Sequence, residues 1–127
     1  MSLRSPLGRV LGHGSAKEGV HHWWVQRLTS VALIPLSVWF VVSLLSLPSL
    51  DYTTVVTWMA HGWTAVLLVL FIAVTTWHSK LGVQVVVEDY VHGGAKTLSL
   101  ILSTFLHTLV AAAAIFAVLK VALGIST

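Results

Sequence analysis

The amino-acid sequence predicts an all-α membrane protein with three transmembrane helices. Of its 127 residues, 57% are hydrophobic and only 9% are charged, whereas about 25% of the residues of a soluble domain are charged. The mean hydropathy is +0.92. Three apolar runs follow one another, and each is long enough to cross roughly 30 Å of hydrocarbon. We therefore divide the chain into an N-terminal tail, residues 1–24, and a three-helix transmembrane domain, residues 25–127.

The tail is rich in residues that break helices and in basic side chains. These are Pro6, Gly8, Gly12, Gly14 and Gly19, together with Arg4, Arg9 and Lys17. This composition predicts irregular structure. Two interpretations stay open, a disordered cytoplasmic arm and a segment that packs on a partner protein.

The first predicted helix spans residues 25–47. Trp23 and Trp24 precede it, where interfacial aromatic residues anchor a membrane helix, and Pro35 in its middle predicts a kink. The second run, residues 54–87, is longer than a perpendicular helix needs, which predicts tilt or a projecting end. Asp51 is expected to cap the start of this helix. The third predicted helix spans residues 96–123.

The basic residues predict the topology. Most of them flank the N-terminal end of the first helix or the second connection, and the first connection has none. The positive-inside rule then places the N-terminus in the cytoplasm and the C-terminus in the periplasm. This distribution indicates membrane orientation rather than a nucleic-acid surface. Because the chain has no cysteine, it ligates no iron–sulfur cluster and forms no disulfide.

His78 is the first candidate for a functional residue. It lies inside the second apolar run, and Gly82 follows one helical turn later, so a large planar group has room to approach. Ionisable residues in membrane spans are usually functional, and neutral imidazole is a common axial ligand of haem iron. The alternative is a histidine that is hydrogen-bonded within the bundle.

His107 lies at a similar depth in the third predicted helix. The similar depth of the two residues therefore allows a haem to be ligated by both His78 and His107 within this one chain. The alternative, which we favour, is a hydrogen bond between helices that stabilises the bundle.

Three charged or phenolic side chains lie near the predicted cytoplasmic surface. Arg27 either extends its guanidinium to the headgroups or binds a carboxylate such as a haem propionate. Asp89 and Tyr90 are either solvated residues at a helix end or a ligand site. In a ligand site the phenol would donate a hydrogen bond to a carbonyl while the carboxylate handles protons.

Two stretches resemble a known family. Gly19-Val20-His21, followed by Arg27 and Thr29, resembles the entry to the first helix of the small membrane anchor subunit of succinate dehydrogenase. The stretch from His78 to Tyr90, with Gly82, Gln84, Val85 and Asp89, is similar to the signature of that subunit. The ending from Glu88 to His92 looks like the bacterial form of the family.

The resemblance implies a four-subunit complex in the bacterial inner membrane. A flavoprotein oxidises succinate, an iron–sulfur protein passes the electrons on, and two membrane anchors hold haem b and help form the ubiquinone site. Carried over by position, His78 is one axial ligand of the haem iron, and the larger cytochrome b anchor supplies the other. Arg27 lies near the propionates, Tyr90 hydrogen-bonds a quinone carbonyl, and Asp89 is close to the proton chemistry.

Two other functions stay open at this point. One is a cofactor-free three-helix assembly or scaffold subunit. The other is a free-standing b-type cytochrome that uses His78 and His107.

Overall fold

The structure is a computed structural model that describes residues 17–125. Its elements are α2 (Lys17–Leu45), α3 (Tyr52–Ala60), α4 (Gly62–Tyr90) and α5 (Gly93–Ala122). Within the described residues, α2, α4 and α5 are long and apolar enough to cross a membrane. The predicted fold class, an all-α protein with three transmembrane helices, is confirmed.

Three boundaries differ from the predictions. The first helix begins at Lys17, eight residues before the predicted start, so only residues 1–16 of the predicted tail lie outside the described residues. The second apolar run is divided at His61, whose φ of −67° and ψ of 126° are extended. This residue ends the short α3 and begins α4. The third helix begins at Gly93, three residues earlier than predicted.

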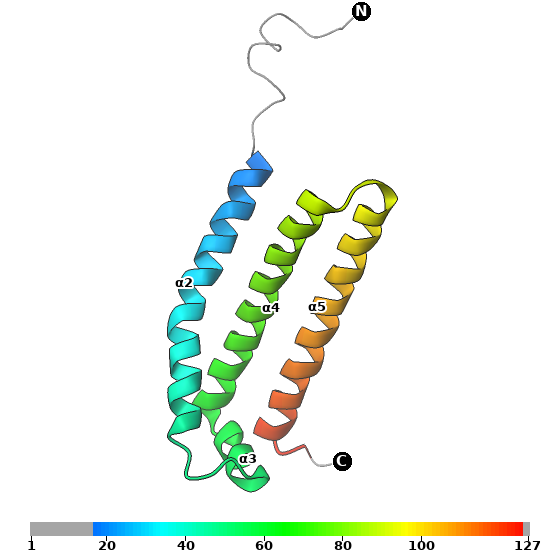
Figure 1. The fold of residues 1–127 in the computed structure, drawn as a ribbon. Coiled ribbons are helices and arrows are strands. Elements are labelled where there is room, and N and C mark those ends of the chain that lie inside the picture. Colours follow the sequence, from blue (N-terminus) through cyan, green and yellow to red (C-terminus); the bar gives the residue numbers. More distant parts are fainter. Residues whose placement is uncertain (1–16, 126–127) are drawn as a thin grey trace, which may run out of the picture.

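The three long helices stand in a row with α4 in the middle, as Figure 1 shows. α4 packs against α2 on one side and α5 on the other, whereas no contact joins α2 to α5 within the described part of the chain. The N-terminal end of α2 and the α4–α5 connection lie at one end of the bundle, and α3 lies at the other (Figure 1). α4 is therefore the helix that joins α2 and α5 into one bundle.

The α4–α5 connection is short. Only Val91 and His92 separate the two helices, and Gly93 has a φ of +64°. This left-handed conformation costs a glycine little and other residues much more. It reverses the chain at the end that also carries Tyr90.

The apolar core is small and lies near α3. Ala65, Leu68 and Val118 are buried, and Trp39 and Phe40 are among the apolar side chains packed against them. Elsewhere, many large apolar side chains are exposed, as expected for surfaces that meet lipid or neighbouring membrane helices. The predicted kink agrees with a change in direction of α2 in its cyan middle part (Figure 1), the region that contains Pro35.

Candidate functional site

His78 lies on α4 and faces α2. It is twelve residues before the end of the helix at Tyr90, about 18 Å along the axis at roughly 1.5 Å per residue. Its Nδ1 is 2.9 Å from Thr29 Oγ1, and its Nε2 is 3.4 Å from the side-chain nitrogen of Gln26. Both ring nitrogens of the half-buried imidazole are therefore engaged by α2.

Thr29 determines which ring nitrogen carries the proton. Its Oγ1 is 2.9 Å from the carbonyl oxygen of Val25 and 3.0 Å from that of Gln26. Carbonyl oxygens only accept, so the single hydroxyl proton is shared between them. With the hydroxyl donating to these carbonyls, Oγ1 accepts a hydrogen bond from Nδ1–H of His78. The neutral ring therefore keeps a lone pair on Nε2, which accepts from the Gln26 amide.

Two buried polar atoms lie along the same face of α2. His22, Gln26 and Thr29 are spaced by four and three residues, which aligns them on one side of a helix. Within the described residues, Nε2 of His22 and Oε1 of Gln26 are buried without a hydrogen-bond partner. A buried polar group left unpaired costs about 1–3 kcal/mol. The surface where α2 packs on α4, here called the α2–α4 seam, is thus polar, and some of its buried polar atoms lack hydrogen-bond partners.

Gly82 lies one turn from His78 toward the end of α4. A Cβ atom added there would have the Gln26 side-chain nitrogen at 3.9 Å as its nearest neighbour, an ordinary contact with a flexible side chain. In this arrangement the Gln26 side chain occupies the position beside Gly82 and His78, so the room predicted there for a large planar group stays a prediction.

His107 lies on the opposite side of α4. Its Nδ1 is 2.7 Å from the carbonyl oxygen of Ser103, so Nδ1 donates and Nε2 accepts. Nε2 is 3.2 Å from Oγ of Ser79 on α4. The favoured prediction, a hydrogen bond between helices, is confirmed. The structure does not bring His78 and His107 together, because one ring is bonded to α2 and the other to the α5-facing side of α4.

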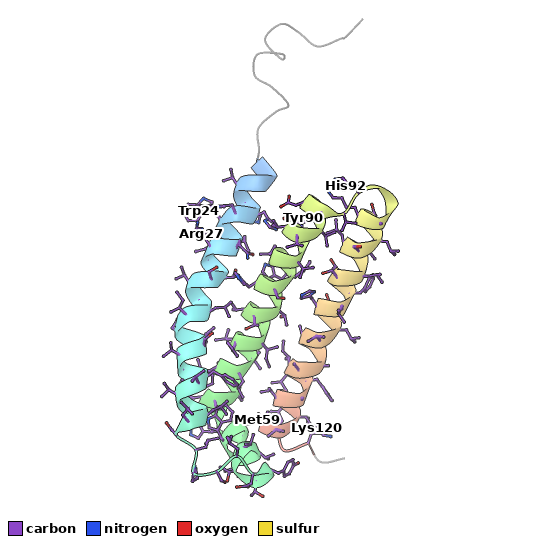
Figure 2. The ribbon with its side chains drawn as sticks, viewed as in Figure 1. Trp24, Arg27, Met59, Tyr90, His92 and Lys120 are labelled. Carbon is purple, nitrogen blue, oxygen red and sulfur yellow. The ribbon has the colours of Figure 1, made fainter. Side chains whose placement is uncertain are left out.

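Arg27, Asp89 and Tyr90 are exposed. Figure 2 shows Arg27 and Tyr90 toward the same end of the bundle, and Asp89 directly precedes Tyr90 in α4. The Arg27 guanidinium lies over the Trp23 ring, with 5.2 Å between Cζ and the ring centroid. Arg27 is next to Gln26 in α2 and so lies off the seam-facing stripe. Tyr90 ends α4 and is 79% exposed. None of the three touches His78 in this arrangement.

The described part of the chain gathers no metal-ligand cluster of its own. Among residues 17–125, no three His, Asp or Glu side chains form a cluster that could hold a metal ion.

Sequence reasoning missed the chemistry of Gln26, Thr29 and Ser79. The spacing of His22, Gln26 and Thr29 along an apolar helix was the available signal for the first two. The partner of His107 was not predictable, because the sequence alone does not tell which side of α4 faces α5.

Comparison with protein families matches residues 1–119 to the succinate dehydrogenase/fumarate reductase transmembrane subunit. The chain belongs to this family. Curated relatives named succinate dehydrogenase hydrophobic membrane anchor subunit agree with this. One from Rickettsia conorii is 32% identical over 106 residues, 81% of this chain and 84% of the relative. One from Paracoccus denitrificans is 29% identical over 124 residues, 98% of this chain and 96% of the relative.

The family assignment confirms the resemblance found in the sequence. This succinate dehydrogenase anchor subunit is a multi-pass protein of the bacterial inner membrane, with three helices that can cross it. A membrane anchor subunit of this enzyme works together with the other subunits of the complex. No solved structure matches the chain significantly.

Proposed function

We propose that this anchor subunit supplies His78 as one axial ligand of haem b and that the larger cytochrome b anchor supplies the other. One observation carries the proposal. The Thr29 hydroxyl donates to carbonyl oxygens of its own helix and lies 2.9 Å from Nδ1 of His78, which supports a neutral ring with its proton on Nδ1 and a lone pair on Nε2 that would bind haem iron.

The residues beside His78 fit a haem group. Gly82 has no side chain one turn away, and its nearest neighbour there is a flexible glutamine. Two buried polar atoms on the facing stripe of α2 lack partners within the described residues. When bound, haem iron supplies one-electron redox chemistry. The chain's own part would be to orient the imidazole and to move the flexible Gln26 side chain aside.

Arg27 would bind a propionate group of the haem. Its guanidinium already lies near the end of α2 against Trp23, and a planar fork with several donors suits a carboxylate.

Tyr90 and Asp89 would form part of the ubiquinone site. Both are exposed at the end of α4, where a ligand in the headgroup region could reach them. The phenol would donate a hydrogen bond to a quinone carbonyl, and the carboxylate would exchange protons with water. The iron–sulfur subunit would supply the electrons, which the flavoprotein subunit takes from succinate.

Replacing His78 by alanine tests the haem proposal. In the intact complex, His78→Ala removes one axial bond, so the low-spin haem spectrum should be lost or shifted. The measurement is the visible spectrum of the reduced, purified complex. His107→Ala is the matched control, because its ring is bonded to Ser79 and Ser103, and it should leave the spectrum unchanged.

Each contrary outcome identifies a different function. An unchanged spectrum in His78→Ala moves the ligand to another residue. A spectrum abolished by His107→Ala indicates ligation within the chain. A native complex with no haem band indicates a cofactor-free anchor, and a band in the isolated chain indicates a free-standing cytochrome.

A further inference from the structure

We propose that Thr29 is the positioning residue for the haem ligand, and this inference rests on the proposed ligation by His78. Thr29 would hold the imidazole as the Nδ1–H tautomer and fix the orientation of the ring. It touches His78 only through Nδ1, on the side of the ring away from the ligating nitrogen. It would therefore act on the iron through the histidine.

The hydroxyl of Thr29 is itself held in place. Its contacts with the carbonyl oxygens of Val25 and Gln26, at 2.9 and 3.0 Å, anchor it to the preceding turn of α2. Threonine is also branched at Cβ, which restricts its rotation in a helix. A rigid acceptor 2.9 Å from Nδ1 favours one rotation of the imidazole about its Cβ–Cγ bond, and therefore one direction of the ring plane.

The same contact affects the electron-donating strength of the ligand. A hydrogen bond from the outer ring nitrogen raises the basicity of a ligating histidine. A more basic imidazole favours the higher charge of oxidised iron, so the bond to Thr29 should lower the reduction potential of the haem. Loss of the acceptor should raise it.

Gln26 contacts the other nitrogen and should behave differently. Its amide lies 3.4 Å from Nε2, the position that iron would take, so haem binding would displace it. A variant at Gln26 would therefore change the lining of the site as well as the contact with Nε2, so the control for Thr29 has to lie outside the site.

Ser30 provides a matched control on the same turn. Its hydroxyl donates to the carbonyl oxygen of Gln26 at 2.8 Å, as the hydroxyl of Thr29 does, but the contact with His78 belongs to Thr29. Ser30→Ala removes a helix-bonded hydroxyl without touching the ligand. Any general effect of such a hydroxyl on α2 would appear in this variant.

The test is redox potentiometry and electron paramagnetic resonance of haem in the intact, membrane-extracted complex. Thr29→Val keeps the side-chain shape and removes the acceptor. At a given ambient potential we expect the ratio of oxidised to reduced haem to fall about tenfold. This corresponds to a rise in the midpoint potential of about 59 mV for a one-electron couple. The low-spin resonance should shift with the altered ring orientation. Thr29→Ser should restore both, and Ser30→Ala should match the wild type.

The outcomes separate this inference from the proposed function. Wild-type potential and resonance in Thr29→Val, with haem lost in His78→Ala, would overturn the role of Thr29 and leave ligation intact. Equal shifts in Thr29→Val and Ser30→Ala would also overturn it. An unchanged spectrum in His78→Ala would instead overturn the ligation itself. If Thr29→Val prevents assembly, Thr29→Ala makes the same comparison, and no shift there contradicts the inference.

Discussion

At the scale of single residues, the two histidines inside the bundle differ in what their accepting nitrogens meet. Nε2 of His107 accepts from a serine hydroxyl on the neighbouring helix, so both ring nitrogens are satisfied within the chain. Nε2 of His78 meets only a glutamine amide at 3.4 Å. Because a short serine is fixed close to its backbone and a glutamine is flexible, only the His78 nitrogen is easily released for another ligand.

His107 should contribute to stability rather than to haem binding. Hydrogen bonds between membrane helices contribute about 0.6 kcal/mol on average and at most about 1.7 kcal/mol. A double-mutant cycle of His107→Ala and Ser79→Ala, followed by detergent unfolding of the subunit, should give a coupling energy in this range. A coupling of zero would mean that the 3.2 Å contact adds nothing to the α4–α5 interface.

Tyr90 should contribute to quinone reduction and to nothing else. A hydrogen bond contributes roughly 0.5–1.5 kcal/mol, and more when its partner gains negative charge. Tyr90→Phe keeps the ring and removes the donor, so quinone reduction should fall about tenfold or more, since about 1.4 kcal/mol is a decade in rate. Haem content and succinate oxidation with an artificial acceptor should not change. Wild-type quinone reduction would leave Tyr90 as an interfacial anchor only.

At the scale of elements, hydrophobicity predicted the helices and missed their ends. The early start of α2 was not predicted because Gly19 was interpreted as a breaker. A glycine costs roughly 1 kcal/mol in a helix interior, which neighbouring residues can outweigh. The division at His61 was missed because apolar residues continue on both sides of it, and Gly62 was the only local signal. The predicted cap at Asp51 is confirmed, since Oδ1 accepts from the Thr54 amide at 3.0 Å.

The start of α3 should depend on pH through Asp51. Hydrogen bonds from Ser49 and from the Thr54 backbone and side chain lower the pKa of this carboxyl from 3.8 to about 2. The folded pKa is the lower one, so the stabilisation is full above about pH 4 and is lost as the pH falls through about 2. Hydrogen exchange at the Thr54 amide should accelerate relative to its intrinsic rate over this interval.

Asparagine at position 51 is the matched control for the cap. Asn caps helices about as well as Asp and does not titrate, so Asp51→Asn should keep the Thr54 amide protected throughout that pH interval. Asp51→Ala should leave it unprotected at every pH. Equal pH dependence in the wild type and in Asp51→Asn would assign the titration to another group.

At the scale of the whole molecule, a row of three helices leaves most apolar surface uncovered. Among the described residues four apolar side chains are buried, and three of them form the cluster near α3. By backbone proximity α2 lies against α4, and α5 lies against α4 and α3. Such a bundle is suited to contact lipid and other membrane helices. Composition was enough to predict this class of fold, whereas His78 was singled out by its place inside an apolar run and by the family resemblance, and its role as a ligand stays a prediction. The hydrogen bonds that set its tautomer depend on the pairing of α2 with α4, which no local pattern contains.

The orientation of the bundle decides on which side the Tyr90 end lies. Lys17 and Arg27 belong to the end of α2 that lies beside the α4–α5 connection, near which Lys96 lies. The positive-inside rule therefore predicts that this end is cytoplasmic. A reporter inserted at Gly93 should be active only in the cytoplasm, and one fused after residue 127 only in the periplasm.

The two reporters check each other, because three crossings place them on opposite sides. Reversed signals would put Tyr90 and Asp89 at the periplasmic face, away from cytoplasmic electron-donating subunits, and would contradict the proposed ubiquinone site. Signals from the same side would contradict three crossings. The expected pattern requires only that the basic end of the bundle stays in the cytoplasm. Neutralising Arg27 and Lys96 together should then produce a mixed orientation, because it weakens the charge asymmetry that sets the topology.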